Sequence, residues 1–505
     1  MLRKTLSTSL ASFRTTCYHL AAAKTPFDPG YRMRRPFALA SVCLFFSGLL
    51  FAKEVTIHGF VTDVKSPTVF EIDDYKVTRD RSLEFDTSDQ KDDKAEAIFK
   101  PEDIRIGTEL EVKGEYDESS GQLKAKSIKV LFEDTRKLKR TALLEQLPSL
   151  VRKDSGWEGE IRADGQRIAV SQETSLTIKL NKSEAKNSPN KKSDEEGSKS
   201  APLTSLDALN LDTFVRYEGT REPDGAIKAQ KIEFRHAELE PGEAKLWKHL
   251  EPKVKEPDYS SFASGELKMH WKKYRIVPNR EAQGYIAKLG ESLIPAHQKE
   301  LPANDPLKIP FRFYLVEAKS FNAVAYPNGV VIVHSGVFDF LQNEAQLAFV
   351  LAHEISHAVE KHEWQALHYH RAELTALRAG GAFIPFGGNI VTSLAASSIQ
   401  NQFARSLENQ ADRVGLEWML AAGYDVREAP ASWKAVSMKK GDRPMNPFWD
   451  NHDNHTTRRS YLMAELKNNY SDLDYSKLKK DSERFHQVAE LVKKAEANEK
   501  KNKDE

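Results

Sequence analysis

Two histidines and a glutamate stand at a spacing that can bind and use a metal ion. Residues 351–362 read LAHEISHAVEKH, which places His353 and His357 four residues apart. On a helix this spacing directs both imidazoles to one side, about 6 Å apart along the axis, so two nitrogens can bind one tetrahedral Zn²⁺. Glu354 flanks them and is predicted to take a proton from the attacking water. The alternative is a partly buried helix with two incidental histidines.

A carboxylate from a later segment completes the ligand set. Glu408 lies in SLENQADRVGLEWMLAAGYD and is predicted to be the third ligand, which leaves one position open for hydrolytic chemistry. Asp412 follows one helical turn later on the same face, where it can hold the free ring nitrogen of a ligand histidine. A structural zinc site closed by Cys and His is disfavoured, because both cysteines lie within residues 1–52.

The apolar pattern predicts the elements that position these residues. Apolar residues recur every three to four positions around LAHEISH, which predicts one helix over about 343–365, and SLENQADRVGLEWMLAAGYD predicts a second amphipathic helix. Upstream, VVIV follows a Pro327-Asn328-Gly329 turn and is a strong strand former.

These segments resemble one family. HEISHAVEKH, ENQAD followed by AGYD, and NAVAYPNGVVIVHSGVF are similar to the zinc metallopeptidases that include the CAAX prenyl protease, HtpX, Oma and BepA, over roughly residues 260–470. The resemblance implies one Zn²⁺ per chain on His353, His357 and Glu408, with Glu354 as general base and Asp412 behind a ligand. It also implies an edge strand over 322–333 that binds the substrate backbone by β-addition. The substrate-binding residues implied are Asn322, Ala323, Val330, Val331 and Ile332.

The family also has a histidine–proline pair six residues before an arginine. Here His452 precedes Arg458 by six residues, with Asp453 in place of proline, and His455 is a competing candidate. The resemblance implies that His452 and Arg458 are catalytic and face a developing oxyanion. The alternative is a solvated turn before a helix that starts at Tyr461.

Two segments upstream repeat one another. GQLKAKSIKV from Gly121 matches GAIKAQKIEF from Gly225, and HGFVTDV from His58 matches EGEIRAD from Glu158. Each copy alternates apolar and polar residues between turn pairs, which predicts small antiparallel β-barrels of OB type. The pattern resembles tandem bacterial β-barrel domains of unknown function. A spacer or protein-docking role is favoured, and a nucleic-acid partner is not expected because aromatic and basic residues do not interleave on the strands.

We therefore predict a multidomain α+β protein. Two OB-like β-barrels precede a mainly helical zincin-type metallopeptidase domain with a short edge-stranded sheet. The predicted divisions are a signal peptide over 1–52, barrel repeats over 53–135 and 150–240 with a disordered insert at 181–203, a peptidase domain over 258–470, and a charged, frayed helical tail over 471–505.

The first 52 residues carry a secretory pattern. An uncharged run over 36–52 follows three arginines and precedes Lys53, with Met33 as an alternative start. This predicts a periplasmic or secreted chain, and the alternatives are an anchor over 36–52 or an organellar presequence. Residues 379–404 are also uncharged, but their glycines and Pro385 favour a lid or buried hairpin over peripheral membrane contact.

Charge excludes two classes of protein, and the motifs above predict an enzyme. The formal net charge of +1 excludes a strongly basic nucleic-acid binder and an acidic solvating protein. We predict a zinc-dependent endopeptidase that acts on protein or peptide substrates in envelope quality control. The alternative is a chaperone-like or binding protein in which the barrels carry the function and the metal site is latent.

Overall fold

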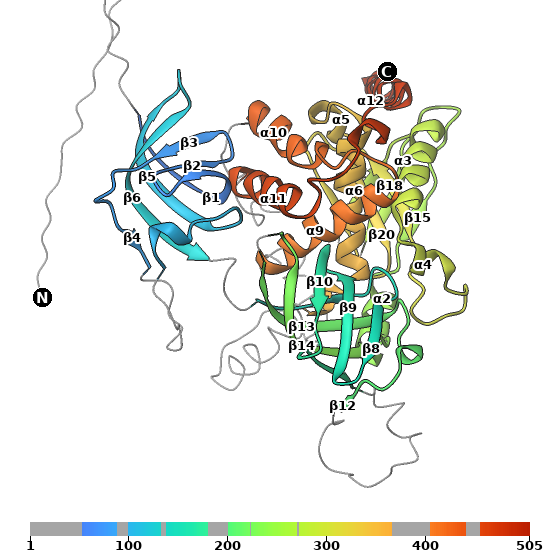
Figure 1. Ribbon diagram of the computed structural model, residues 1–505. Coiled ribbons are helices and arrows are strands. Elements are labelled where there is room, and N and C mark those ends of the chain that lie inside the picture. The colour runs from blue at the N-terminus through green and yellow to red at the C-terminus, as the bar shows by residue number, and fades with distance from the viewer. Residues whose placement is uncertain are drawn as a thin grey trace, which may run out of the picture. The chain divides into compact units, whose positions relative to one another are not determined.

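The computed structural model describes residues 53–87, 99–132, 138–179, 200–222, 224–269, 272–365, 405–440 and 455–504. The predicted signal peptide, the segment 379–404 and His452 lie outside these residues. Within them, strand-rich modules come first along the chain and a mainly helical region follows (Figure 1). Among the described helices, none has both the length and the apolar character needed to span a bilayer.

The first module is one sheet with a buried face. Its strands alternate in polarity, so that residues such as Val61, Phe70 and Leu123 are fully buried in one core. The pairings run from β1 through β2, β3 and β6 to β5, and β5 pairs again with β1. The strands are β1 (Lys53–Ser66), β2 (Val69–Ile72), β3 (Tyr75–Thr78), β4 (Phe85–Asp86), β5 (Glu109–Asp117) and β6 (Gln122–Phe132).

The second module has a separate sheet and core. β7 belongs to this sheet, so the module already begins at Leu138, although the predicted repeat began at residue 150. Residues 200–202, at the end of the predicted disordered insert, form strand β12 against β11. The strands are β7 (Leu138–Leu143), β8 (Ser149–Lys153), β9 (Gly156–Ala163), β10 (Gln166–Val170), β11 (Ser175–Lys179), β12 (Ser200–Pro202), β13 (Thr213–Arg221) and β14 (Ile227–His236).

Both modules contain a hairpin that shifts register at a glycine. One of the two shifts between β5 and β6 falls at Gly114, and the shift between β13 and β14 falls at Gly219. A Cβ atom would lie 2.1 Å from the Lys124 carbonyl oxygen at Gly114, and 2.4 Å from the Lys228 carbonyl oxygen at Gly219. Only glycine therefore fits at either bulge.

The third sheet belongs to the helical region and places one strand at its edge. The strand order is β15–β16–β17–β18–β20–β19, and β18 and β20 are parallel. Among the described strands, β19 pairs only with β20 and therefore forms one edge of the sheet. The strands are β15 (Lys253–Lys255), β16 (Gly265–Met269), β17 (Lys272–Ile276), β18 (Arg312–Val316), β19 (Ala323–Ala325) and β20 (Val330–His334).

This order corrects the predicted edge strand over 322–333. That segment forms two strands, and β20 is paired on one side with β18 and on the other with β19. Val330, Val331 and Ile332 are fully buried on β20, so a substrate backbone can add to β19 but not to β20.

Helices α3, α9 and α10 pack against a central helix, α6. Most of α6 is buried on all sides, as is typical of a core helix. The helices are α2 (Pro241–His249), α3 (Arg280–Leu293), α4 (Ala296–Glu300), α5 (Val337–Phe340), α6 (Glu344–Val359), α9 (Arg405–Ala421), α10 (Glu428–Lys440), α11 (His455–Asn469) and α12 (Glu483–Asp504).

Local signals set the length of α6. The Asn343 side chain caps its first turn by accepting a hydrogen bond from the Gln346 amide at 3.0 Å. The helix ends at Val359 with Glu360 as its C-cap, because the following residue, Lys361, has a left-handed φ of 57°. α9 lies beside α6 (Figure 1). Gly415 permits this approach, because a Cβ there would lie 3.1 Å from the His353 amide nitrogen.

The tail is an integral part of the core rather than a frayed helix. α12 buries Phe485, Val488 and Val492 in the same apolar cluster that contains α6. Charged residues such as Glu483, Lys493 and Lys494 are exposed on its opposite face.

Candidate active site

The three predicted ligands converge. Nε2 of His353 lies 3.1 Å from Nε2 of His357, and the Glu408 carboxylate oxygens lie 3.5 and 3.6 Å from these two nitrogens. All three donor atoms fall within 4.8 Å of one another, and all three side chains are buried. α6 supplies the histidines through their four-residue spacing, and α9 supplies the carboxylate from its first turn.

The surroundings of the two imidazoles fit a cation between them. Nδ1 of His353 lies 3.0 Å from Asp412 Oδ1, and Nδ1 of His357 lies 2.9 Å from Nδ1 of His362. If both outer nitrogens donate, the two inner Nε2 lone pairs face each other and a carboxylate. That arrangement is repulsive unless a cation lies between them, and two imidazoles with one carboxylate suit a divalent metal such as zinc.

Glu354 lies beside the ligands but turns toward the edge strand. Its Oε2 accepts a hydrogen bond from the Ala325 amide of β19 at 2.9 Å. Burial raises the pKa of Glu354 to about 7. A carboxylate with a pKa close to neutrality is suited to accept and return a proton in one catalytic cycle.

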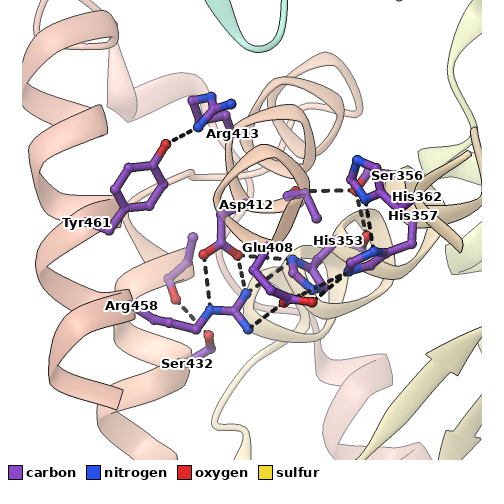
Figure 2. A network of polar contacts seen from close by, with 12 residues as sticks. His353, Ser356, His357, His362, Glu408, Asp412, Arg413, Ser432, Arg458 and Tyr461 are labelled. Carbon is purple, nitrogen blue, oxygen red and sulfur yellow. Dashed lines mark hydrogen bonds and ion pairs between the residues drawn. The ribbon is translucent and has the colours of Figure 1, made fainter. Parts of the chain in front are cut away.

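Asp412 and Arg458 form a buried pair directly behind His353 (Figure 2). The Arg458 guanidinium donates to Asp412 through Nε at 3.1 Å and through a second N–H, and Nη1 lies 3.5 Å from Glu408 Oε2. Although burial alone raises the pKa of Asp412, the Arg458 charge and the His353 contact outweigh burial and lower it. Asp412 is therefore ionised and can accept from His353 Nδ1, which directs Nε2 to the metal position.

Arg458 is part of this support in addition to any contact with substrate. Its guanidinium carbon lies 4.2 Å from the centre of the Trp433 ring on α10. α11 begins at His455, ahead of the expected start at Tyr461, and Arg458 is only 2% exposed, so the solvated-turn alternative is wrong for Arg458. An oxyanion contact by Arg458 stays a prediction, and the role of His452 falls outside the described residues.

The first module holds the helix that carries Arg458. Residues on either side of this arginine contact β1. The Ser460 hydroxyl accepts from the Phe60 amide at 2.8 Å, and the Thr457 hydroxyl donates to the His58 carbonyl at 2.9 Å. The rings of Phe60 and Tyr461 pack edge to face.

The residues implied to bind substrate separate into two groups. Ala323 lies on β19 and Asn322 precedes it, with its side-chain Oδ1 buried and without a hydrogen-bond partner in the described part of the chain. Val330, Val331 and Ile332 instead form the buried strand behind β19. Substrate binding by Asn322 and Ala323 stays a prediction.

Sequence reasoning did not single out three residues that shape the site. Gly415 allows α9 to approach His353, and a glycine inside an amphipathic helix was its signal. His362 is fully buried against His357, and Gln410 accepts from His362 Nε2 at 3.1 Å. His362 is the last histidine of LAHEISHAVEKH, but no local pattern places Gln410 next to it.

Comparison with known proteins agrees with this geometry. Residues 280–467 match peptidase family M48, which confirms the expected family, and residues 58–129 match a domain of unknown function, DUF5666. The chain is 33% identical over 161 residues to the putative beta-barrel assembly-enhancing protease of Vibrio cholerae, and 33% identical over 156 residues to the beta-barrel assembly-enhancing protease of Escherichia coli K12. It is 30% identical over 162 residues to the mitochondrial metalloendopeptidase OMA1 of Bos taurus.

These matches cover one part of each protein. They span 29–30% of this chain and 31% of each relative, so the chain spans about a third of the length of the curated relatives it matches. The segment that matches peptidase family M48, residues 280–467, contains His353, His357 and Glu408.

Asp412→Asn is expected to weaken zinc binding by about 10–100-fold. The neutral amide accepts a weaker hydrogen bond from His353, and Arg458, without its aspartate partner, competes with the metal for the Glu408 carboxylate. Competition with a chromophoric chelator measures this affinity. Asp425→Asn is the matched control, since Asp425 is also a buried aspartate paired with an arginine, Arg427 at 2.6 Å, but outside the metal-binding cluster. Equal losses in the two variants would contradict a specific role for Asp412.

Proposed function

We propose that this chain, whose residues 280–467 form a domain of peptidase family M48, is a zinc-dependent endopeptidase that cleaves peptide bonds in protein substrates. The observation that carries the proposal is the buried convergence of His353, His357 and Glu408, with Glu354 next to an edge strand. A binding protein has no need for an ionisable carboxylate held beside an open metal position.

Each residue of the site has a separate role in the proposed hydrolysis. His353, His357 and Glu408 would hold the metal, which when bound supplies Lewis acidity that polarises a carbonyl and activates water. Glu354 accepts the proton of the attacking water and returns it to the leaving amine. The Ala325 amide orients the Glu354 carboxylate, which couples the general base to the strand that binds substrate.

β19 is the surface that the substrate backbone would use. It lies at one edge of its sheet, where β20 is its hydrogen-bonded neighbour. An extended peptide that adds to this edge runs past Glu354, because the Ala325 amide already touches that carboxylate. Such binding depends more on main-chain hydrogen bonds than on the side chains of the substrate. It therefore suits an endopeptidase that acts on unfolded segments.

The β modules are proposed to be duplicated OB-like barrels that position the peptidase domain. The ring of pairings that returns from β5 to β1 supports closure of the first barrel. The shared glycine bulges at Gly114 and Gly219 support the duplication.

Glu354→Gln is expected to keep about one zinc per chain while turnover falls by roughly three or more decades, because the amide cannot accept the proton and holds the water less well. Casein cleavage with and without a chelator, together with metal analysis, measures both quantities.

Glu344→Gln is the matched control on the same helix, since Glu344 binds Tyr285 and Tyr424 in the first turn of α6, outside the metal-binding cluster. It should stay active. Retained activity in Glu354→Gln, or cleavage that a chelator does not stop, would overturn the proposed function and favour the binding-protein alternative.

A periplasmic or secreted location is part of the proposal. The charge order before Lys53 supports it, and the name of the bacterial relatives, beta-barrel assembly-enhancing protease, supports a role in envelope protein quality control. The exported protein should begin near Lys53 on N-terminal sequencing. A retained segment 1–52 would argue for an anchored or organellar protein instead.

A further inference from the structure

A chain of hydrogen bonds leads from the second module to the metal ligand His357. Nδ1 of His357 lies 2.9 Å from Nδ1 of His362, and Nε2 of His362 lies 3.1 Å from Oε1 of Gln410. The Gln410 amide nitrogen then donates to the main-chain carbonyl of Thr141 on β7 at 3.0 Å. His362 is 0% exposed and Gln410 is 4% exposed, so water does not replace these contacts.

The chain has one consistent direction. A main-chain carbonyl can only accept, so Gln410 must present its NH₂ to Thr141 and its oxygen to His362. That oxygen also only accepts, so Nε2 of His362 carries the hydrogen. In the neutral ring Nδ1 is then an acceptor, which leaves Nδ1 of His357 as the donor and Nε2 of His357 as the lone pair directed at the other ligands.

We propose that His362 is a positioning residue, which, anchored through Gln410 to the Thr141 carbonyl, fixes the tautomer and orientation of His357 for metal binding. This inference rests on the metal site of the proposed function. It gives His357 the kind of support that Asp412 gives His353, with an imidazole and a main-chain anchor in place of a carboxylate.

The second module is therefore a structural part of the metal site and not a spacer. Two residues beyond Thr141, on the same side of the strand, the Leu143 amide donates to the Glu360 carboxylate at the end of α6, at 3.1 Å. The outer edge of β7 thus finds its partners on α6 and α9, the two helices that carry the ligands. Arg413 of α9 also donates to the Asp164 carbonyl at 3.0 Å, a second buried contact with this module.

Zinc affinity of the full-length chain, measured with Zn²⁺ alone against a chromophoric chelator, tests the proposal without any need for peptide cleavage. His362→Leu removes the acceptor for His357 and should weaken binding about 10–100-fold. His362→Asn places an amide oxygen where Nδ1 stands and should recover most of the affinity. Gln410→Met keeps the imidazole but removes its anchor, and it should weaken binding in the same direction.

Ser356→Ala is the matched control. Its hydroxyl donates to the His353 carbonyl at 2.7 Å on the same buried helix and lies 3.4 Å from the Ala411 carbonyl on α9 (Figure 2). These two contacts are to main-chain carbonyls and do not involve the imidazole of His357 or of His362. It should lower the melting temperature of the metal-free protein and leave zinc affinity within about threefold, the separation that a positioning role predicts.

Three outcomes would overturn the proposal: zinc affinity of His362→Leu within about threefold of the unmodified chain, His362→Asn no better than His362→Leu, or an equal loss in Ser356→Ala. A chain that binds no zinc overturns both this inference and the proposed function. A chain that binds zinc but cleaves no peptide overturns only the proposed function.

Discussion

Three side chains that could hold a metal ion, His353, His357 and Glu408, are buried with their ligand atoms within 4.8 Å of one another, and the surrounding contacts follow from this burial. Removing a carboxylate and two imidazoles from water is costly unless each finds a partner. Asp412 and Arg458 supply partners on one side of the cluster, and His362 supplies one on the other. The site is therefore a connected polar network inside an apolar core, and its members hold one another in place.

The β modules contribute contacts to the helices that carry this network. Helix α9 must keep Glu408 beside His353 and His357. Arg413 on the same helix is buried against Asp164 of the second module. Asp164 also accepts from the Tyr217 hydroxyl at 2.7 Å, so the contact reaches into the core of that module. The first module contacts α11 on both sides of Arg458 in the same manner. Both modules thus contact the helices of the site through hydrogen bonds and do not supply any of the three proposed metal ligands.

The sequence was sufficient for the parts of the site that depend on local geometry. A four-residue spacing places two side chains on the same face of a helix. This spacing relates His353 to His357 and Glu408 to Asp412, so the proposed ligands and the residue behind them could be predicted. The order of strands in a sheet depends on distant pairings, so the segment 322–333 was assigned one edge strand where the structure has an edge and a buried strand. The anchor of His362 joins residues 141, 362 and 410, which no local pattern connects. The charges of the tail concealed the apolar face of α12 that packs on the core.

Two imidazoles and one carboxylate of this chain are proposed to hold one catalytic zinc. X-ray absorption at the zinc edge of the full-length, zinc-loaded chain tests this proposal most directly, because it counts the ligands without relying on activity. We expect about one zinc per chain, bound by two imidazole nitrogens and by oxygen at about 2.0–2.2 Å, with no sulfur at about 2.3 Å. A shell with one imidazole or none, a sulfur ligand, or zinc well below one per chain would contradict it.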